Sequence, residues 1–367
     1  MSYKIDDLPL TTLLPALSRA EDQLARLDEI VRRSPVGEGY AERAHFSEAA
    51  ASMWVAGELV HIEDLVLHDA NMDVRTPTHE TTIAHSILWS RRSITEQESV
   101  WAITKAGIEH LIGRRSSPMH RTGAGEGDQS LTLSSPRADI DDGFATEMAE
   151  IDAVLARSTR TLLRIDEERK SDPVAVGELF IHDPDWDEDD RLSNWRSSLQ
   201  EVEALPATLA AAILWDAWET LEPLQRQHWL GGQLVSSYLR SRGKVTSHLF
   251  CLNVGLKSIP REMRRSRNRT SRLVAGLVAM AAAAEIGIKE VIRLGQAREQ
   301  LQRKLRNKRS SSSLPGLVDL LITRPVVSSS MIVESLKVSH RGALNLVTEL
   351  GVRELTGRGS YRVWGIL

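Results

Sequence analysis

Apolar residues recur every three or four positions through most of the chain, which is the spacing of helices that bury one face. The first clear case is Leu10–Arg33, and the Ser-Pro-Val-Gly run at 34–37 ends it. Strand-like alternation is absent from this part of the sequence. We therefore expect residues 1–112 to form an all-α region. Its expected helices are Leu10–Arg33, 41–68 with a break near Gly57, 77–92 and 95–112.

The helical pattern stops over residues 113–143. Glycine, serine and proline are frequent there, most densely at 116–118 and 123–127. This composition is typical of flexible linkers, and a loop of about thirty residues is usually functional or disordered. We interpret the segment either as the boundary between two helical bodies or as a region that becomes ordered on binding.

Helical spacing returns over residues 144–309, which we expect to form a helical core. The acidic run at 183–190 lacks the glycine and the closing glutamate of an EF-hand loop, so we expect a solvated turn that caps the next helix. The segment 273–284 is almost wholly apolar, which predicts either a core helix or a dimer contact. The expected helices are 144–170, 205–221, 223–243, 249–254, 273–284 and 285–309.

The last part of the chain, residues 314–367, begins with two short helices. Pro325 ends the first, expected at 315–322, because proline lacks an N–H donor and disfavours helix in the residue before it. Three serines at 328–330 are candidate N-caps for the second helix, expected at 331–336.

A turn at 337–339 leads into a third helix, His340–Leu350, and Gly351 stands where a C-terminal glycine belongs. Two β-like runs follow at 352–355 and 360–364, and we expect them to pair as a hairpin. This is the order of a winged helix-turn-helix. In that domain the last helix lies in the major groove of DNA and the hairpin contacts the backbone or minor groove.

Charge is distributed unevenly. The net charge is −4, with 46 Lys and Arg against 50 Asp and Glu. From Lys257 to the C-terminus, 21 Lys and Arg stand against 8 Asp and Glu, a net of +13, so the preceding residues carry −17. A basic C-terminal third indicates contact with a polyanion, although the two parts can also neutralise each other within one molecule or a dimer. The runs 261–272 and 303–309 are the most basic.

The composition of this 367-residue chain, with 41% hydrophobic and 26% charged residues, is that of a soluble protein of two or three domains. The single cysteine, Cys251, excludes an intramolecular disulfide and a cysteine zinc finger, and we expect its side chain to be buried. No apolar run approaches the ~20 residues that span a bilayer, and the N-terminus lacks a secretory core. We expect a cytoplasmic protein without membrane contact.

The third helix of the C-terminal segment begins with polar residues of the types that read DNA. Arginine can bind guanine through two hydrogen bonds, and asparagine can do the same with adenine. Leu344, Val347 and Leu350 are expected to face the core of the small domain. Each polar position is explained equally well as an exposed side chain. The candidate DNA-contacting residues are Ser339, His340, Arg341 and Asn345 on the helix, and Arg353, Arg358 and Arg362 at the hairpin.

Three segments carry a family resemblance. Residues 222–230 read Glu-Pro-Leu-Gln-Arg-Gln-His-Trp-Leu, residues 48–57 read Glu-Ala-Ala-Ala-Ser-Met-Trp-Val-Ala-Gly, and residues 318–366 hold the winged helix. Together they resemble the Fic family, whose usual activity is transfer of AMP from ATP to a protein hydroxyl. In that family the first segment is a His-Pro-Phe-x-Asp-Gly-Asn-Gly-Arg loop between two helices. The resemblance implies a mainly α fold, a Fic-like helical bundle followed by a winged helix-turn-helix with a small β-hairpin.

The loop at 222–230 departs from the family at its chemical positions. Only Pro223 is retained. Glu222 stands where the family has a histidine base, and a glutamate acts as a base at neutral pH only if burial raises its pKa. Arg226 stands where an aspartate holds magnesium, and Leu230 where an arginine pairs with phosphate. His228 is either a structural histidine or a relocated base. The departures imply a scaffold that has lost catalysis, with no metal and no cofactor.

We therefore expect a sequence-specific transcriptional regulator that binds double-stranded DNA as a homodimer, with an unidentified small-molecule or protein effector. Two alternatives stay open. One is a nucleotidyl (AMP) transferase with Glu222 or His228 as base, and ATP-dependent labelling that Glu222→Ala abolishes would favour it. The other is a protein-interaction module that partners a Fic enzyme, and recovery of a second protein with weak, sequence-insensitive DNA binding would favour that.

Overall fold

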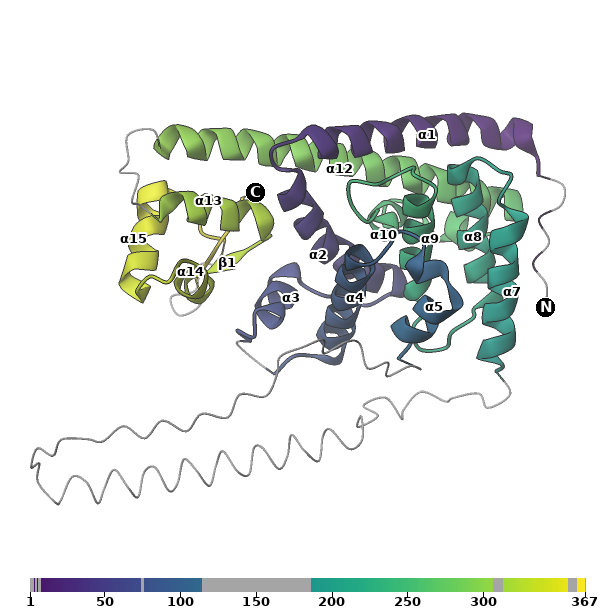
Figure 1. The fold of residues 1–367 in the computed structure, drawn as a ribbon, viewed down its shortest axis with the longest axis horizontal. Helices are drawn as coiled ribbons and strands as arrows, with labels where there is room; N and C mark the ends of the chain where they lie inside the picture. Colours follow the sequence, from purple (N-terminus) through teal and green to yellow (C-terminus); the bar gives the residue numbers. More distant parts are fainter. Residues whose placement is uncertain are drawn as a thin grey trace, which may run out of the picture. The chain divides into compact units, whose positions relative to one another are not determined.

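The computed structural model describes residues 3, 5, 8–73, 76–113, 186–305, 313–355 and 362–366 (Figure 1). Met1–Ser116 and Asp187–Leu367 belong to one compact unit. Most of the expected linker, from residue 114 onward, and the expected helix at 144–170 lie outside the described residues. The domain boundaries expected near 112 and 309 stay predictions, and described elements pack on one another across both.

The described part is mainly α-helical, as the sequence predicts. Asp187 accepts a hydrogen bond from the Asp190 amide at 2.9 Å and caps α7, which confirms that the acidic run precedes a helix. The helices are α1 (Leu10–Arg33), α2 (Gly37–Ala56), α3 (Ile62–Asp69), α4 (His79–Glu96), the 3-10 helix η1 (Trp101–Ile103), α5 (Lys105–Leu111), α7 (Glu188–Glu201), α8 (Ala207–Leu221), α9 (Leu230–Ser241), α10 (Leu252–Leu256), α11 (Arg261–Arg264), α12 (Arg269–Leu305), α13 (Leu314–Thr323), α14 (Ser329–Leu336) and α15 (His340–Leu350).

Two helix boundaries differ from expectation. The helix expected at 95–112 is wrong, because α4 continues to Glu96 and a new N-cap, Thr104, accepts from the Gly107 amide at 3.0 Å to start α5. The helix expected at 223–243 begins only at Leu230. Proline at 223 has no N–H to donate, so the chain leaves α8 there and restarts after a turn.

The helix α12 is one continuous segment of 37 residues where the sequence predicted two helices, at 273–284 and 285–309. Its buried face continues past Glu285, through Gly287, Val291 and Leu294. The change from an apolar to a more polar sequence at Glu285 is therefore not a helix end. α1 lies along it (Figure 1). By length and composition α12 is also apolar enough to cross a membrane, but 56% of its most apolar window is buried in the protein, as in a core helix.

The C-terminal segment contains the three helices that the sequence predicts, α13, α14 and α15, and strand β2 (Val363–Trp364) has a partner that the sequence did not predict. β2 pairs antiparallel with β1 (Val327–Ser328), which directly precedes α14. The run at 352–355 also contacts β2, as expected, through an antiparallel bridge between Glu354 and Trp364 and hydrogen bonds from the Leu355 amide to the Val363 carbonyl at 2.9 Å and from the Gly365 amide to the Arg353 carbonyl at 3.4 Å. Val327 is buried and Ser328 caps α14 in an extended conformation, so these two residues form a short strand that lies beside β2.

Arg43 of α2 holds the C-terminal segment on the helical body. Its guanidinium is buried and donates to the carbonyl oxygens of Leu321 at 3.1 Å, Arg324 at 2.7 Å and Ile366 at 3.5 Å. Burial lowers the pKa of Arg43 to about 10, although the Glu290 carboxylate at 3.4 Å opposes this shift. One side chain therefore satisfies three carbonyl groups of the C-terminal segment.

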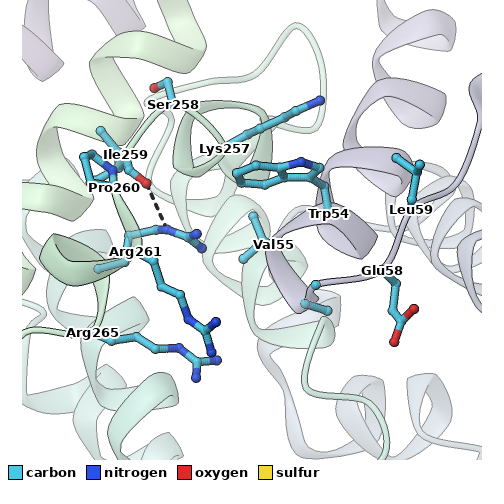
Figure 2. Close-up of a pocket in the computed structure, with 13 residues that line it drawn as sticks. Trp54, Val55, Glu58, Leu59, Lys257, Ser258, Ile259, Pro260, Arg261 and Arg265 are labelled. Atoms are coloured by element: carbon cyan, nitrogen blue, oxygen red, sulfur yellow. Dashed lines mark hydrogen bonds between the residues drawn. The ribbon is translucent and has the colours of Figure 1, made fainter.

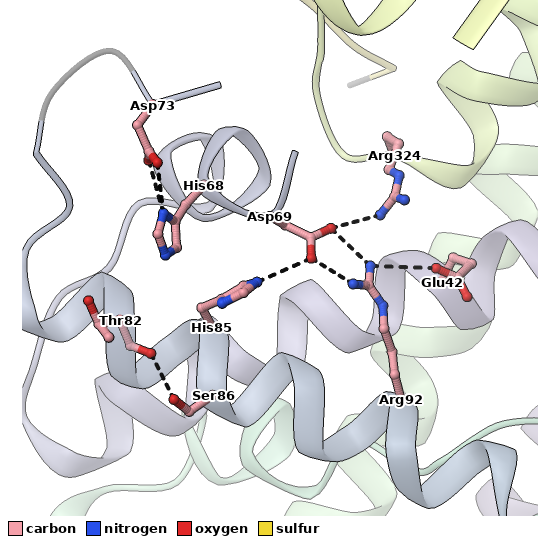
Figure 3. Close-up of polar contacts among 9 residues, drawn as sticks. All are labelled: Glu42, His68, Asp69, Asp73, Thr82, His85, Ser86, Arg92 and Arg324. Carbon is pink, nitrogen blue, oxygen red and sulfur yellow. Dashed lines mark hydrogen bonds and ion pairs between the residues drawn. The ribbon is translucent and has the colours of Figure 1, made fainter. Parts of the chain in front are cut away.

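Asp69, at the end of α3, makes a second link between the two parts (Figure 3). Its carboxylate accepts from Arg92 at 2.6 and 3.1 Å and pairs with Arg324 at 3.3 Å, while His85 lies 3.5 Å away. Partial burial opposes ionisation, but the contacts from His85 and Arg92 and the charge of Arg324 hold the pKa of Asp69 below its usual range.

Candidate nucleic-acid interface

The helix α15 has one buried and one exposed face. Ala343, Val347 and Leu350 are buried in the small domain. Leu344 is half-buried, so the expected apolar face is largely confirmed. The polar residues at the start of the helix therefore remain on the solvent side.

Ser339 and the three polar residues after it occupy the accessible end of α15. His340, Arg341 and Asn345 are exposed. The Ser339 hydroxyl accepts from the Gly342 amide at 3.1 Å, so this side chain caps the helix. Four of the candidate residues are therefore exposed at the N-cap and in the first two turns of α15, with Ser339 already bonded to its own helix.

The other candidates surround the two-stranded sheet. Arg353 is exposed. Arg362 is engaged, because its guanidinium donates to the Glu354 carboxylate at 2.6 and 2.9 Å and lies 5.4 Å from the centre of the Trp364 ring. Arg358 lies outside the described residues. Arg353 and Arg362 are therefore both exposed in the described part of the wing, and Arg362 is paired with Glu354.

Two contacts place α15 against the body. Lys304, near the end of α12, donates to the carbonyl oxygens of Leu350 at 2.7 Å and Gly351 at 3.4 Å. A cation is well placed there, because the carbonyl groups at a helix C-terminus carry partial negative charge. The Lys304 contact thus stabilises the end of α15 that lies opposite the candidate DNA-contacting residues.

The loop at 222–230 connects α8 to α9. Glu222 is exposed and has a left-handed backbone with φ of 43°, whereas Pro223 is buried and Arg226 is exposed. Two amides of the loop end are already bonded, Leu230 to the Gln227 carbonyl at 2.9 Å and Gly231 to the His228 carbonyl at 3.3 Å. These two N–H groups are therefore not free to bind an anion.

His228 pairs with a carboxylate of the preceding helix. Its Nε2 atom lies 2.7 Å from Glu219. Burial favours the neutral ring, but the hydrogen bond to Glu219 and the charges of Glu219 and Glu222 raise the pKa of His228 overall. The His228 carbonyl also accepts from the Trp218 indole at 2.9 Å. His228 thus fastens the loop to α8.

Candidate metal ligands do not cluster in the described ranges, where no group of three or more His, Cys, Asp or Glu side chains is arranged to hold an ion. Cys251 is buried as expected, and burial raises the pKa of its thiol to about 12. Sequence reasoning did not single out Arg43 or Asp69, because their roles depend on partners that are distant in the sequence.

Comparison with known proteins finds separate family matches for two parts of the chain. Residues 180–306 match the family described as a protein of unknown function (DUF1612), and residues 314–367 match an HTH DNA binding domain. A crystal structure of a Fic family protein from Desulfovibrio desulfuricans G20 superposes with a TM-score of 0.48 at 11% identity, over 99% of this chain and 98% of that one.

One relative matches the whole chain. The uncharacterized protein y4cF of Sinorhizobium fredii is 43% identical over 385 aligned residues, which cover 100% of both chains. Identity at this level over the full length is that of one protein family. The chain belongs to the family of y4cF and ends in a helix-turn-helix DNA-binding domain.

Proposed function

We propose that this protein is a sequence-specific, DNA-binding transcriptional regulator whose helical body does not catalyse AMP transfer. The observation that carries the proposal is the polar start of α15, where His340, Arg341 and Asn345 are exposed. A helix presented in this way can enter the major groove with its N-terminal residues toward the base edges.

The loop at 222–230 supports the non-catalytic part of the proposal. Glu222, which stands at the position of the family's histidine base, is exposed to solvent and not enclosed in a site. The Leu230 and Gly231 amides are bonded within the turn, and the Trp218 ring closely covers Gly231. ATP-dependent labelling of the protein or of a partner, lost in Glu222→Ala, would contradict this part.

Arg341→Ala tests the DNA-reading surface. If Arg341 makes a bidentate contact with guanine, the variant loses roughly 1–3 kcal/mol of specific binding and relaxes the preference at one base pair. The measurement is selection of binding sites from a random DNA pool, followed by a gel-shift titration on the selected site. Unchanged affinity and preference would contradict the placement of Arg341.

Arg26→Ala is the matched control. Arg26 is an exposed arginine of α1 that pairs with Asp22 at 3.0 Å, outside the C-terminal domain. The Arg26→Ala variant loses the same charge as Arg341→Ala without a change in α15, so we expect it to bind DNA as the unaltered protein does.

We also propose that the protein binds a palindromic site as a homodimer, because paired recognition helices read paired half-sites.

A further inference from the structure

A groove lies between the end of α2 and the segment that joins α10 to α12 (Figure 2). Its volume is about 670 Å³. None of its lining residues belongs to the loop at 222–230. The lining consists of Trp54, Val55, Ala56, Gly57, Glu58, Leu59, Lys257, Ser258, Ile259, Pro260, Arg261, Arg264 and Arg265.

Positive charge dominates one wall of this groove. Lys257, Arg261, Arg264 and Arg265 all line it, and within the described ranges none of them forms an ion pair with a carboxylate. Burial and the neighbouring charges of Arg265 and Arg261 lower the pKa of Arg264, although the carboxylates of Glu219 and Glu262 oppose this shift. Like charges held together in this way favour an anionic ligand that would neutralise them.

Two of the four cations, Lys257 and Arg264, are held in place by contacts with the groove wall. The Arg264 Nε atom donates to the Ile259 carbonyl at 3.1 Å, which fixes the guanidinium at the wall. Lys257 and Arg264 lie 5.6 and 5.8 Å from the centre of the Trp54 ring, within the range of cation–π contacts. Figure 2 places the one acidic lining residue, Glu58, across the groove from Arg265.

Trp54 adds an apolar surface beside these charges. Its side chain is at the end of α2 and is 38% exposed, and Leu59 on the same side is 69% exposed. A large aromatic ring next to several cations can contact the flat part of an organic anion while the cations contact its charged part. The groove therefore offers two kinds of contact side by side.

We propose that this groove binds a small phosphorylated organic molecule, with its phosphoryl oxygens on Arg261 and Arg265 and its apolar part on Trp54. Arginine suits phosphate because its planar guanidinium can donate two parallel hydrogen bonds. The volume falls in the range of small-molecule pockets, about 300–1,000 Å³. The site does not depend on DNA binding by α15.

The test is isothermal titration of the full-length protein with pyrophosphate. We expect binding by the unaltered protein and a loss of roughly ten-fold or more in Arg261→Gln/Arg265→Gln, because hydrogen bonds to charged groups are strong. Arg26→Gln/Arg33→Gln on α1 removes the same charge from another surface and should bind as the unaltered protein does. Circular dichroism checks that every variant is folded.

A second arm tests Trp54. 1-Naphthyl phosphate should bind more tightly than inorganic phosphate to the unaltered protein, and Trp54→Leu should remove this difference while it leaves the affinity for inorganic phosphate unchanged. Equal loss of both affinities would contradict the assigned role of Trp54.

Two results would overturn the site. One is the absence of any binding heat with pyrophosphate, and the other is equal affinity in the Arg261→Gln/Arg265→Gln variant. If pyrophosphate did not bind and Arg261→Gln/Arg265→Gln weakened DNA binding, the groove arginines would instead contact the DNA backbone. Loss of DNA affinity in Arg341→Ala bears only on α15, so the two proposals fail separately.

Discussion

Single buried side chains join segments of this protein that are far apart in the sequence. Arg91 of α4 is fully buried and donates to the carbonyl of Leu249 at 2.7 Å. Glu48 of α2 is also fully buried and accepts from the amides of Asn253 and Val254 at 3.0 and 3.1 Å. A buried charged group is costly unless it is paired, so these contacts hold the segment before and within α10 in one conformation.

His228 gives a pH-dependent prediction. Its pKa is raised in the folded protein, so its contribution to stability is complete below the unfolded value of about 6.5 and is lost as pH rises through the folded value. His228→Gln should therefore destabilise the protein more at mildly acidic than at alkaline pH. The imidazole is 43% exposed, which limits the effect to roughly 0.3–1 kcal/mol.

Urea unfolding of both proteins on either side of neutrality measures this difference. Glu219→Gln is the control, because removing the carboxylate should make the His228→Gln effect nearly independent of pH. If the loss of unfolding free energy in His228→Gln were the same at acidic and alkaline pH with Glu219 present, the His228–Glu219 pair would not titrate as described.

At this scale the sequence predicted types of residue better than partners. Buried Cys251, the cap Ser339 and the exposed Arg341 follow from residue chemistry and position in a helix. The roles of Arg43 and Arg91 do not, because their acceptors are backbone carbonyl groups, which every residue has. Only the folded arrangement decides which carbonyl groups lie within reach.

The turn between α14 and α15 sets the direction of the candidate recognition helix. Lys337 ends α14 in the left-handed conformation, with φ of 54°. Residues with a Cβ atom disfavour this region, and branched residues disfavour it most. The cap Ser339 follows after Val338, so α15 starts three residues after a constrained position.

Lys337→Val should lower the free energy of unfolding by more than about 1 kcal/mol, because a β-branched residue is strained at positive φ. Lys337→Gly should leave it unchanged or raise it, because glycine adopts the conformation freely. Thermal unfolding of both variants provides the comparison. Equal behaviour of the two would indicate that this turn relaxes without cost.

At the scale of elements, helices with clear apolar faces and the contact of residues 352–355 with β2 were predicted, whereas the pairing of β2 with β1 was missed. α1, α8, α14 and α15 follow from local spacing, caps and breakers. The partner of β2 could not be found locally, because β1 has only two residues and lies outside any alternating run. The continuity of α12 was missed because a change of composition at Glu285 resembled a boundary.

The helix α2 connects the basic groove with the C-terminal domain. Its first half carries Arg43, and Gly39 packs so closely on Ile322 of α13 that a Cβ atom there would collide with it. Its last residues, beginning at Trp54, line the basic groove. A ligand in the groove and the DNA-binding domain therefore contact the same rigid helix.

Arg43→Met should loosen the C-terminal domain from the body. It leaves buried carbonyl groups such as that of Leu321 without a donor, which costs roughly 1–3 kcal/mol. We expect faster hydrogen exchange in α13 and little change in α8. Arg26→Met, on an exposed part of α1, is the control. Unchanged exchange in α13 would mean that other contacts suffice to hold the domain.

If the protein regulates transcription as proposed, the contact of Lys304 with the Leu350 carbonyl has a consequence for promoters. α12, about 55 Å long at 1.5 Å per residue, ends beside α15, so a duplex engaged by α15 also dictates the direction in which the body projects. Shifting the binding site by about five base pairs, half a helical turn, would carry the body to the opposite side of the DNA, and a full turn of about ten would restore it. Any polymerase contact made by the body would then vary with helical phase as well as with distance.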